Sequence, residues 1–155
     1  MPARTLVAVL AGAALLPRHD MATPLVQFLD YWRSRSDDDV PHRNTLDPCD
    51  LAPLLAHLLM WDVLDDGRYR VRLAGTALCN AAGRELTGLP ADQFPWQDTA
   101  TLCAQFDQVR DRGTLLYVER LLPRDRKPPQ RCQHLVTPWR QDTSIRYLLG
   151  IIVFI

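Results

Sequence analysis

The sequence predicts an α+β fold that combines five strands with several helices. Three observations predict it: a tight hairpin turned at Asp66-Gly67, two helical segments directly after that hairpin, and three strand-like runs that complete the chain. The resulting order is β-β-α-α-β-β-β, with further helical segments in front and no internal repeat.

Length and composition fit one globular domain. The chain has 155 residues, of which 47% are hydrophobic and 23% charged. A chain of this length buries about two-thirds of the surface that its unfolded form exposes. The formal net charge is zero, so nothing global directs the protein to nucleic acid or to an anionic membrane, and we expect neither partner. One basic group falls in a predicted strand–turn–strand region, and we interpret it as solvated: Arg120, Arg124, Arg126, Lys127 and Arg131.

Residues 1–22 differ from the rest of the chain. Arg4 and the apolar run over 6–16 have the pattern of a secretory signal, although the run is too short to span a bilayer as a helix. Met21 lies just before a well-formed helix start, so residues 1–20 are also interpretable as a mis-assigned upstream extension or as an additional packed helix. We therefore divide the chain into an extension or signal-like segment over 1–22 and one folded domain over 23–155.

The cysteines indicate a cellular compartment. They are far apart in the sequence and none falls in a C-x-x-C pair, which disfavours zinc and a thioredoxin-like site: Cys49, Cys79, Cys103 and Cys132. Dispersed cysteines in apolar surroundings are typical of free thiols in a reducing compartment. We expect the protein to be cytoplasmic.

An amphipathic helix is predicted over 24–35, with Thr23 as its N-cap and Pro24 at its first position. Its apolar stripe repeats at i, i+3, i+4 and i+7 and consists of Leu25, Phe28, Leu29 and Trp32. A second helix start lies at Asp47-Pro48, and Pro53 keeps that helix short or irregular.

Two strands follow, over 58–64 and 68–73. They are joined at Asp66-Gly67, because Asp-Gly supplies the positive φ angles that a two-residue turn needs. The second strand alternates between two sets of side chains, which predicts one buried face: Tyr69, Val71 and Leu73 on one side, Arg68, Arg70 and Arg72 on the other.

Two helices and three strands complete the chain. One helix starts at Gly75-Thr76 and runs through 86, with Gly88 as its C-terminal cap, and Asp98 caps a longer helix that Gly113 ends. The last strands are predicted over three segments, with proline-rich or polar loops over 123–129 and 139–143 between them: 115–122, 131–137 and 146–155.

Six short motifs carry a family resemblance: Tyr31-Trp32, Asp47-Pro48, His57-Leu58, Asp66-Gly67-Arg68-Tyr69, Arg72-Leu73-Ala74-Gly75-Thr76 and Gly83-Arg84-Glu85-Leu86-Thr87-Gly88. In this order they resemble the PAS-like family of short, mostly alphaproteobacterial proteins, over about residues 24–153. Ala56 departs from the family pattern, since many relatives have a proline before the histidine, and this bears only on the local turn. The resemblance implies a PAS-like five-stranded antiparallel sheet with helices on one face, a sensory or interaction module, and no known catalytic residues.

The resemblance also implies that the first and fifth strands are central. Both segments, 58–64 and 145–154, are apolar on both faces, whereas an antiparallel sheet normally leaves one face to solvent. The outer face must therefore be covered, and the helix over 24–35 is the candidate, on its own sheet or on that of a partner. Burying four apolar side chains stabilises the folded state by about 1.5–3 kcal/mol each. Ordering some twelve residues costs about 1–2 kcal/mol each, which offsets this stabilisation. We therefore expect a homodimer with its interface at Leu25, Phe28, Leu29 and Trp32.

Two groups of residues are candidate ligand-binding positions. Gly75-Thr76 places backbone N–H groups at a helix start close to Arg72, which suits an anion, although a strand-to-helix turn explains the same residues and is the interpretation we favour. Asn80 and Arg84 follow Thr76 by one and two helical turns and are interpretable as one cleft or as plain helix surface. Large aromatics line an apolar pocket or fill the core: Trp61, Trp96 and Tyr117.

Catalysis has little support in the sequence. His57 and His134 are the candidates for axial haem ligands, but no haem signature surrounds either, and the cofactor stays unknown. Pairing His134 with Asp107 or Glu119 as acid and base rests on assumption alone. No nucleophile elbow, metal-ligand spacing or phosphate loop occurs in the sequence, so we expect no catalytic residues and no metal site.

We therefore expect a PAS-like sensory or regulatory module in bacterial signalling, which binds a small ligand or a protein partner and is not an enzyme. Two alternatives come from other classes: a scaffolding dimer whose pocket is filled by its own side chains, and a small α+β-barrel enzyme of the dehydratase type. An empty cavity of a few hundred cubic ångströms favours the sensor and a packed one the scaffold, and a buried His hydrogen-bonded to an Asp in an open cleft would favour the enzyme.

Overall fold

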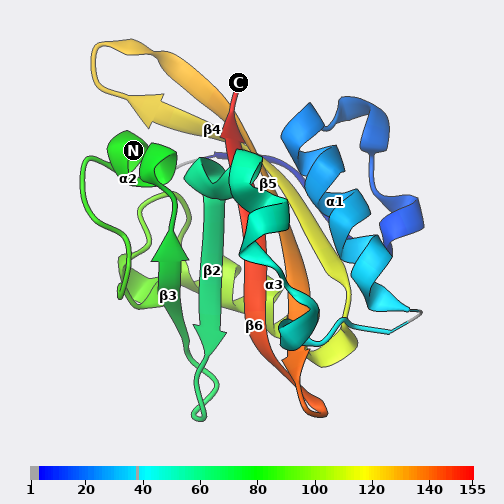
Figure 1. Ribbon diagram of the computed structural model, residues 1–155. Helices are drawn as coiled ribbons and strands as arrows, with labels where there is room; N and C mark the ends of the chain where they lie inside the picture. The colour runs from blue at the N-terminus through cyan, green and yellow to red at the C-terminus, as the bar shows by residue number, and fades with distance from the viewer. Residues whose placement is uncertain (1–3, 38) are drawn as a thin grey trace.

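A six-stranded antiparallel sheet forms the centre of the computed structural model, which describes residues 4–37 and 39–155. The strand order is β1-β4-β5-β6-β2-β3, and Figure 1 shows β3, β2, β6 and β5 side by side. The strands are β1 (Arg4–Ala11), β2 (Leu58–Val63), β3 (Tyr69–Ala74), β4 (Leu115–Arg124), β5 (Lys127–Gln141) and β6 (Ser144–Phe154). The α+β fold class is confirmed. The last strand, β6, lies in the middle of the sheet and β3 at one edge, as expected.

The sixth strand, β1, comes from the segment that precedes the predicted domain. It pairs antiparallel with β4 at the edge opposite β3, with Arg4 facing Leu121 and Ala11 facing Leu115. The interpretation of this N-terminal segment as an additional packed helix is therefore wrong. Valines at 7 and 9 favour an extended chain, and the free edge of β4 supplies the hydrogen-bond partners that a strand needs.

Helices cover both faces of the sheet and not one alone. We call the outer face the one covered by α1 (Thr23–Ser36) and the 3₁₀ helix η4 (Pro48–His57). The inner face is covered by α2 (Thr76–Ala82), the 3₁₀ turn η5 (Ala91–Gln93) and α3 (Thr99–Arg112). Three further 3₁₀ turns lie in the connections: η1 (Ala13–Leu15), η2 (Arg18–Asp20) and η3 (Arg43–Thr45). Figure 1 shows α1 lying over the sheet in front of β5.

Strand alternation separates the apolar side chains into two clusters, one on each face. In β6, Leu148 and Ile152 belong to the inner cluster, whereas Leu149 and Ile151 belong to the outer one. The central strands are apolar on both faces because both faces are covered. At the uncovered edge, β3 turns Arg70 and Arg72 to solvent.

The apolar stripe of α1 is buried against the sheet of its own chain. Leu25, Phe28 and Leu29 are 0% exposed and Trp32 is 8% exposed. The indole nitrogen of Trp32 donates a hydrogen bond to the Pro138 carbonyl oxygen on β5, at 3.0 Å. These four residues are thus covered within one chain and present no apolar stripe to a second subunit. A homodimer stays a prediction, and it would need a different surface.

Several boundaries differ from the predicted ones for local reasons. The β2–β3 hairpin is longer than a two-residue turn: the Leu64 N–H donates to the Arg68 carbonyl oxygen, and of the turn residues only Gly67 has a positive φ, at 84°. The first helix begins at Thr23, one residue earlier than predicted. Helix α2 ends at Ala82 and not near 86, because Gly83 already adopts the left-handed conformation that ends a helix.

The last three strands are longer than predicted. Arg126 and Asp142 take positive φ values of 56° and 54°, which allows tight turns at these non-glycine positions. The predicted loops over 123–129 and 139–143 therefore become mostly strand, and Figure 1 shows the β4–β5 hairpin extending beyond the rest of the sheet. Among the described residues, no helix has the length and apolar character needed to cross a bilayer.

Candidate functional site

Five polar side chains are buried in the sheet, and they divide between its two faces. Arg120 on β4 and His134 on β5 lie on the inner face, in line with the apolar residues two positions away in their strands. The outer face holds the other three, namely Glu119, Gln133 and Thr137. Buried polar groups require partners, so each face is considered separately.

Arg120 is only 1% exposed, and its guanidinium group is held by two uncharged partners. Its Nη1 atom donates to Nδ1 of His134 at 3.1 Å, and its Nη2 atom donates to the side-chain oxygen of Gln97. Gln97 lies in the turn between η5 and α3, and its amide nitrogen donates to Gln105 of α3 at 2.8 Å. The inner-face site, which we define as Gln97, Arg120 and His134, thus joins the sheet to the turn that precedes α3.

His134 is completely buried, and its ring extends toward Gly150 of β6. A Cβ atom at Gly150 would lie 3.1 Å from Nε2 of His134 and 2.7 Å from the Leu135 carbonyl oxygen. Glycine is therefore required at this point in a central strand. Because Nδ1 accepts a hydrogen bond from Arg120, the neutral ring carries its hydrogen on Nε2.

Three buried side-chain atoms have no hydrogen-bond partner among residues 4–37 and 39–155. They are Nε1 of Trp61, Nε of Arg120 and Nε2 of His134. All three residues are on the inner face, and all three atoms are N–H donors in this arrangement. A buried donor without an acceptor costs about 1–3 kcal/mol, so three such groups on one face call for a functional explanation.

The electrostatics of the site follow from burial. Burial lowers the pKa of Arg120 to about 10, so the guanidinium group is still a cation at neutral pH. Burial, and secondarily the charge of Arg120, lowers the pKa of His134 well below its ordinary value and keeps the ring neutral. Burial also raises the pKa of the neighbouring Cys132 thiol. Of the ion pairs formed within the described ranges, none includes Arg120.

Aromatic rings and a small cavity surround this site. The ring of Trp61 packs edge-on against Phe94 and Phe106, at centroid distances of 5.3 and 5.1 Å. Trp96, which precedes Gln97, packs against Phe154 at 5.6 Å. Trp96, Leu122 and Phe154 help to line a cavity of about 260 Å³. Leu122 follows Arg120 by two positions on the same face of β4, and Trp96 precedes Gln97, so chain neighbours of the inner-face site border this cavity.

The outer face carries a second polar network, which holds the start of α1. The side chain of Gln133 accepts a hydrogen bond from the Ala22 N–H and donates one to the Asp20 carbonyl oxygen, each at 2.6 Å. Glu119 accepts from three donors on the same face: Tyr117, Arg131 and Gln133. Burial alone would raise the pKa of Glu119, but these bonds outweigh it and hold that pKa below its usual value. We call Gln133, with its bonds to Asp20 and Ala22, the α1 anchor.

The predicted aromatic pocket is divided by the sheet. Trp61 and Trp96 belong to the inner cluster, whereas Tyr117 belongs to the outer one and donates to Glu119. The structure therefore brings the two tryptophans to one side and places Tyr117 on the other. Successive side chains of a strand point to opposite faces of the sheet. The sequence interpretation did not establish which face of the sheet Tyr117 lies on.

The predicted group around Arg72 is spread over the surface. Arg72 lies on the outer side of β3, where it pairs with Asp62 at 3.3 Å. Thr76 and Asn80 are exposed on α2, and Arg84 follows the end of that helix, so helical spacing does not align it with them. A Cβ atom at Gly75 would lie 2.2 Å from the Ala56 carbonyl oxygen, so the start of α2 is closed by η4. Gly75 therefore makes the strand-to-helix turn, and Gly75, not Thr76, is the N-cap of α2.

The sequence interpretation placed Arg120 in a solvated basic group, did not consider Gln97, and named His134 only as a weakly supported haem-ligand or acid–base candidate. One signal was available for Arg120. Leu116, Val118 and Leu122 occupy alternate positions in the same strand, and Arg120 shares their face. The other side chains of β4, Tyr117, Glu119 and Leu121, include polar and apolar residues alike. For this reason the basic group from Arg120 to Arg131 was interpreted as solvated.

The arrangement does not assemble a catalytic pair. The hydrogen-bond partner of His134 is Arg120 and not a carboxylate. Glu119 lies on the opposite face of the sheet, and Asp107 accepts from the Tyr69 hydroxyl at 2.5 Å. His57 contacts the Ile152 carbonyl oxygen through Nδ1.

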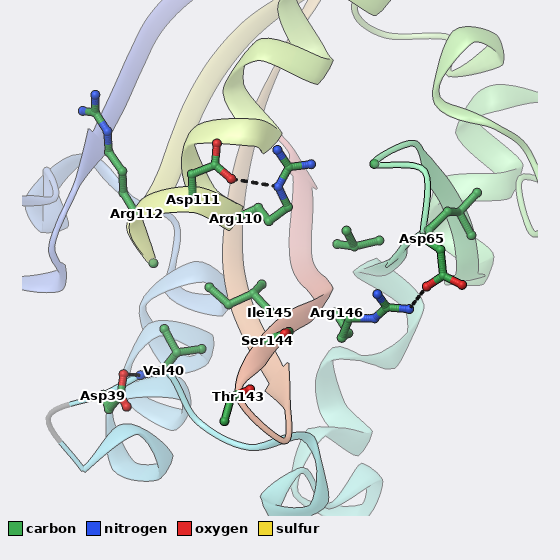
Figure 2. A pocket seen from close by; sticks show the side chains of 14 residues that line it. Asp39, Val40, Asp65, Arg110, Asp111, Arg112, Thr143, Ser144, Ile145 and Arg146 are labelled. Atoms are coloured by element: carbon green, nitrogen blue, oxygen red, sulfur yellow. Dashed lines mark hydrogen bonds and ion pairs between the residues drawn. The ribbon is translucent and has the colours of Figure 1, made fainter.

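A larger open cleft of about 650 Å³ lies at one end of the sheet, where the C-terminus of α3 meets the β2–β3 and β5–β6 hairpins. Figure 2 shows two pairs of oppositely charged side chains in it. Arg110 donates to Asp111 at 2.9 Å, and Arg146 donates to Asp65 at 2.6 Å. Because these charges are exposed and already paired, the cleft offers fewer unsatisfied groups to a ligand than the inner-face site.

Comparison with known proteins agrees with the topology. A family model described as PAS domain matches residues 21–153. One solved structure, a light-oxygen-voltage domain studied with a flavin analogue, is 16% identical, with a TM-score of 0.50 over 68% of this chain and 81% of that chain. At this identity the likeness concerns the fold alone. No curated relative matches the sequence.

Proposed function

Because the chain belongs to the PAS domain family, we propose that it is a sensory module that binds a small molecule on the inner face of its sheet, around Arg120 and His134. Family membership supports a sensory role in general terms. The observation that carries the site is the pair of buried N–H donors, Nε of Arg120 and Nε2 of His134, that lack acceptors within the described part of the chain. A bound molecule with acceptor atoms would satisfy them.

The strands offer a route by which binding affects the outer face. Arg120 follows Glu119 in β4, and His134 follows Gln133 in β5, so the two strand residues of the inner-face site are chain neighbours of residues in the outer polar network. A shift of these strands on ligand binding would change the bonds of Gln133 to Asp20 and Ala22. We expect the signal to leave the domain through α1 and to reach a protein partner by direct contact.

The compartment is part of the same proposal. The four cysteines are free thiols, and Cys132 is buried in the inner cluster. Free thiols in a folded domain are typical of a reducing compartment. This supports bacterial cytoplasmic signalling as the setting, which fractionation of the native host with an antibody to the protein would test.

Native mass spectrometry of protein purified from its own host tests the binding function. We expect a retained small molecule in the wild type and its loss in Arg120→Gln, with retention in the control Arg126→Gln, an exposed position in the turn that follows the same strand. Wild-type protein without any retained molecule, and without a thermal shift in a metabolite screen, would contradict the proposal.

One observation favours the scaffolding alternative as a second candidate. The rings of Trp61, Phe94 and Phe106 are in contact, so side chains of the protein itself occupy much of the inner face. A scaffold would show the same melting temperature in every ligand screen and no retained molecule. Arg120→Gln would then leave partner binding unchanged.

A further inference from the structure

We propose that the ligand of the inner-face site is a small carboxylate with an apolar body, and that the Gln97 side chain occupies the carboxylate position in the free protein. This inference rests on the proposed function and names its ligand class. It is carried by the buried, uncompensated Arg120, by the type of the unpartnered atoms, and by the place of Gln97 between Arg120 and α3.

The first step concerns charge. Arg120 is 1% exposed, and its side-chain partners are a neutral amide and a neutral imidazole. Placing a cation in the interior without a counter-ion is costly, and proteins normally supply a carboxylate. Within residues 4–37 and 39–155 no carboxylate lies in ion-pair distance of Arg120. The missing negative charge is what an anionic ligand would bring.

The second step concerns hydrogen bonding. The unpartnered atoms of Arg120 and His134 are both donors, so the site calls for a group that accepts only. An ionised carboxylate has two oxygens that accept and none that donates. A hydroxyl or amide ligand would bring donors of its own to a site already rich in them.

The third step concerns Gln97. Its side-chain oxygen accepts from Nη2 of Arg120, while its amide nitrogen is held by Gln105. This oxygen is a neutral substitute for a carboxylate oxygen. A carboxylate would replace it with an ion pair, in which both the donor and the acceptor carry charge. Gln97 is half-buried in a turn and not in a helix or strand, so it is able to move aside without unfolding an element.

The fourth step concerns the body of the ligand. The cavity of about 260 Å³ that Leu122 and Trp96 border has mostly apolar side chains on its walls, including Ala82 and Phe154, and two polar ones, Arg124 and Gln130. A compact apolar group fits such walls, and its burial adds about 25 cal/mol per Å². A monocarboxylate of the benzoate or hexanoate type combines the two features that the site requires.

Titration calorimetry of the full chain with benzoate and hexanoate tests the inference, with benzamide and hexanamide as neutral probes of the same shape. We expect the carboxylates to bind at least roughly tenfold more tightly than the amides. Arg120→Gln should abolish this preference, while Arg126→Gln, an exposed change in the β4–β5 turn, should keep it. Gln97→Ala should tighten carboxylate binding, since Nη2 of Arg120 then lacks its internal acceptor. The carboxylate–amide comparison in the wild type needs no variant and therefore stands even where Arg120→Gln folds poorly.

Two outcomes would overturn the inference. Equal binding of amides and carboxylates would show that the site accepts neutral ligands, and the proposed sensory function would then stand without the anion. Failure of both carboxylates to bind, or to shift the Nε resonance of Arg120, would also refute it. The native mass spectrometry experiment would then decide separately whether any other molecule is held.

Discussion

Arg120 is the residue on which the chemistry of this protein depends most. Its neighbours in β4 on the same face, Val118 and Leu122, are apolar, and a methionine of similar length would fit the same surroundings. The pKa of Arg120, lowered to about 10, means that burial opposes the cation. Each pKa unit corresponds to about 1.4 kcal/mol, so the cation destabilises the folded state.

We expect Arg120→Met to raise the free energy of unfolding by about 1–3 kcal/mol, because it removes a buried charge that no carboxylate compensates. Urea denaturation of the ligand-free protein measures this change. The exposed control Arg124→Met should alter stability by less than about 0.5 kcal/mol. A loss of stability in Arg120→Met would mean that the bonds to Gln97 and His134 outweigh the cost of burial.

His134 should give the protein a pH-dependent stability. The pKa of the ring is far below the value of 6.5 expected in the unfolded chain, so the unfolded state binds the additional proton. Stability is then fully present above pH 6.5 and is lost as the pH falls toward the folded-state pKa, by up to about 1.4 kcal/mol per pH unit.

Denaturation between pH 7 and pH 5 isolates this effect, since ordinary carboxylates titrate mostly below that window. His134→Asn keeps an acceptor near the position of Nδ1 and does not titrate. We expect its stability to be nearly level across the window. An equal slope in both proteins would assign the pH dependence to other groups.

At the scale of elements, β4 and β5 have two tasks. Their inner side chains form the site, and their outer side chains hold α1, because successive residues of a strand point to opposite faces. Gln133 is central to the second task, with three hydrogen bonds from one amide group.

Gln133→Ala should destabilise the fold by about 1–3 kcal/mol, since it removes two part-buried hydrogen bonds to the Ala22 N–H and the Asp20 carbonyl oxygen. Hydrogen exchange should show the loss of protection concentrated in the first turn of α1. Gln93→Ala, an exposed change of the same kind, is the control. Uniform loss of protection over the whole chain would contradict a local anchor.

At the scale of the whole molecule, the question is what covers the outer face. In the structure α1 covers the sheet of its own chain, and Leu29 is fully buried there. Leu29→Ala should therefore cost about 2–5 kcal/mol of stability. Val26→Ala, on the partly buried side of α1, should cost less.

The cost of Leu29→Ala should be the same at every protein concentration, because the contact is within one chain. Denaturation over a hundredfold range of concentration measures this. A cost that grows as the protein is diluted would place α1 on a partner. Sedimentation of the wild type tests the homodimer itself, which would have to form through residues other than Leu25, Phe28, Leu29 and Trp32.

Local pattern alone predicted the order of the five core strands, the amphipathic stripe of α1 and the helix between Asp98 and Gly113. These features depend on contacts between residues close in sequence, such as the Asp98 side chain that accepts from the Thr101 N–H. The strand β1 was not predicted, because its conformation depends on pairing with β4, more than a hundred residues away. Turn lengths also depend on how the neighbouring strands meet.

The sequence by itself determined that the sheet is apolar on both sides and that an amphipathic helix is available to cover it, since both follow from the periodicity of hydrophobic residues. Only the tertiary structure decided that the helix covers its own chain, that Tyr117 and Trp61 lie on opposite faces, and that Arg120 meets His134 and Gln97 in the interior. The physical reason is that a strand pattern fixes which residues share a face, whereas strand pairing and packing decide which face is buried with which neighbours.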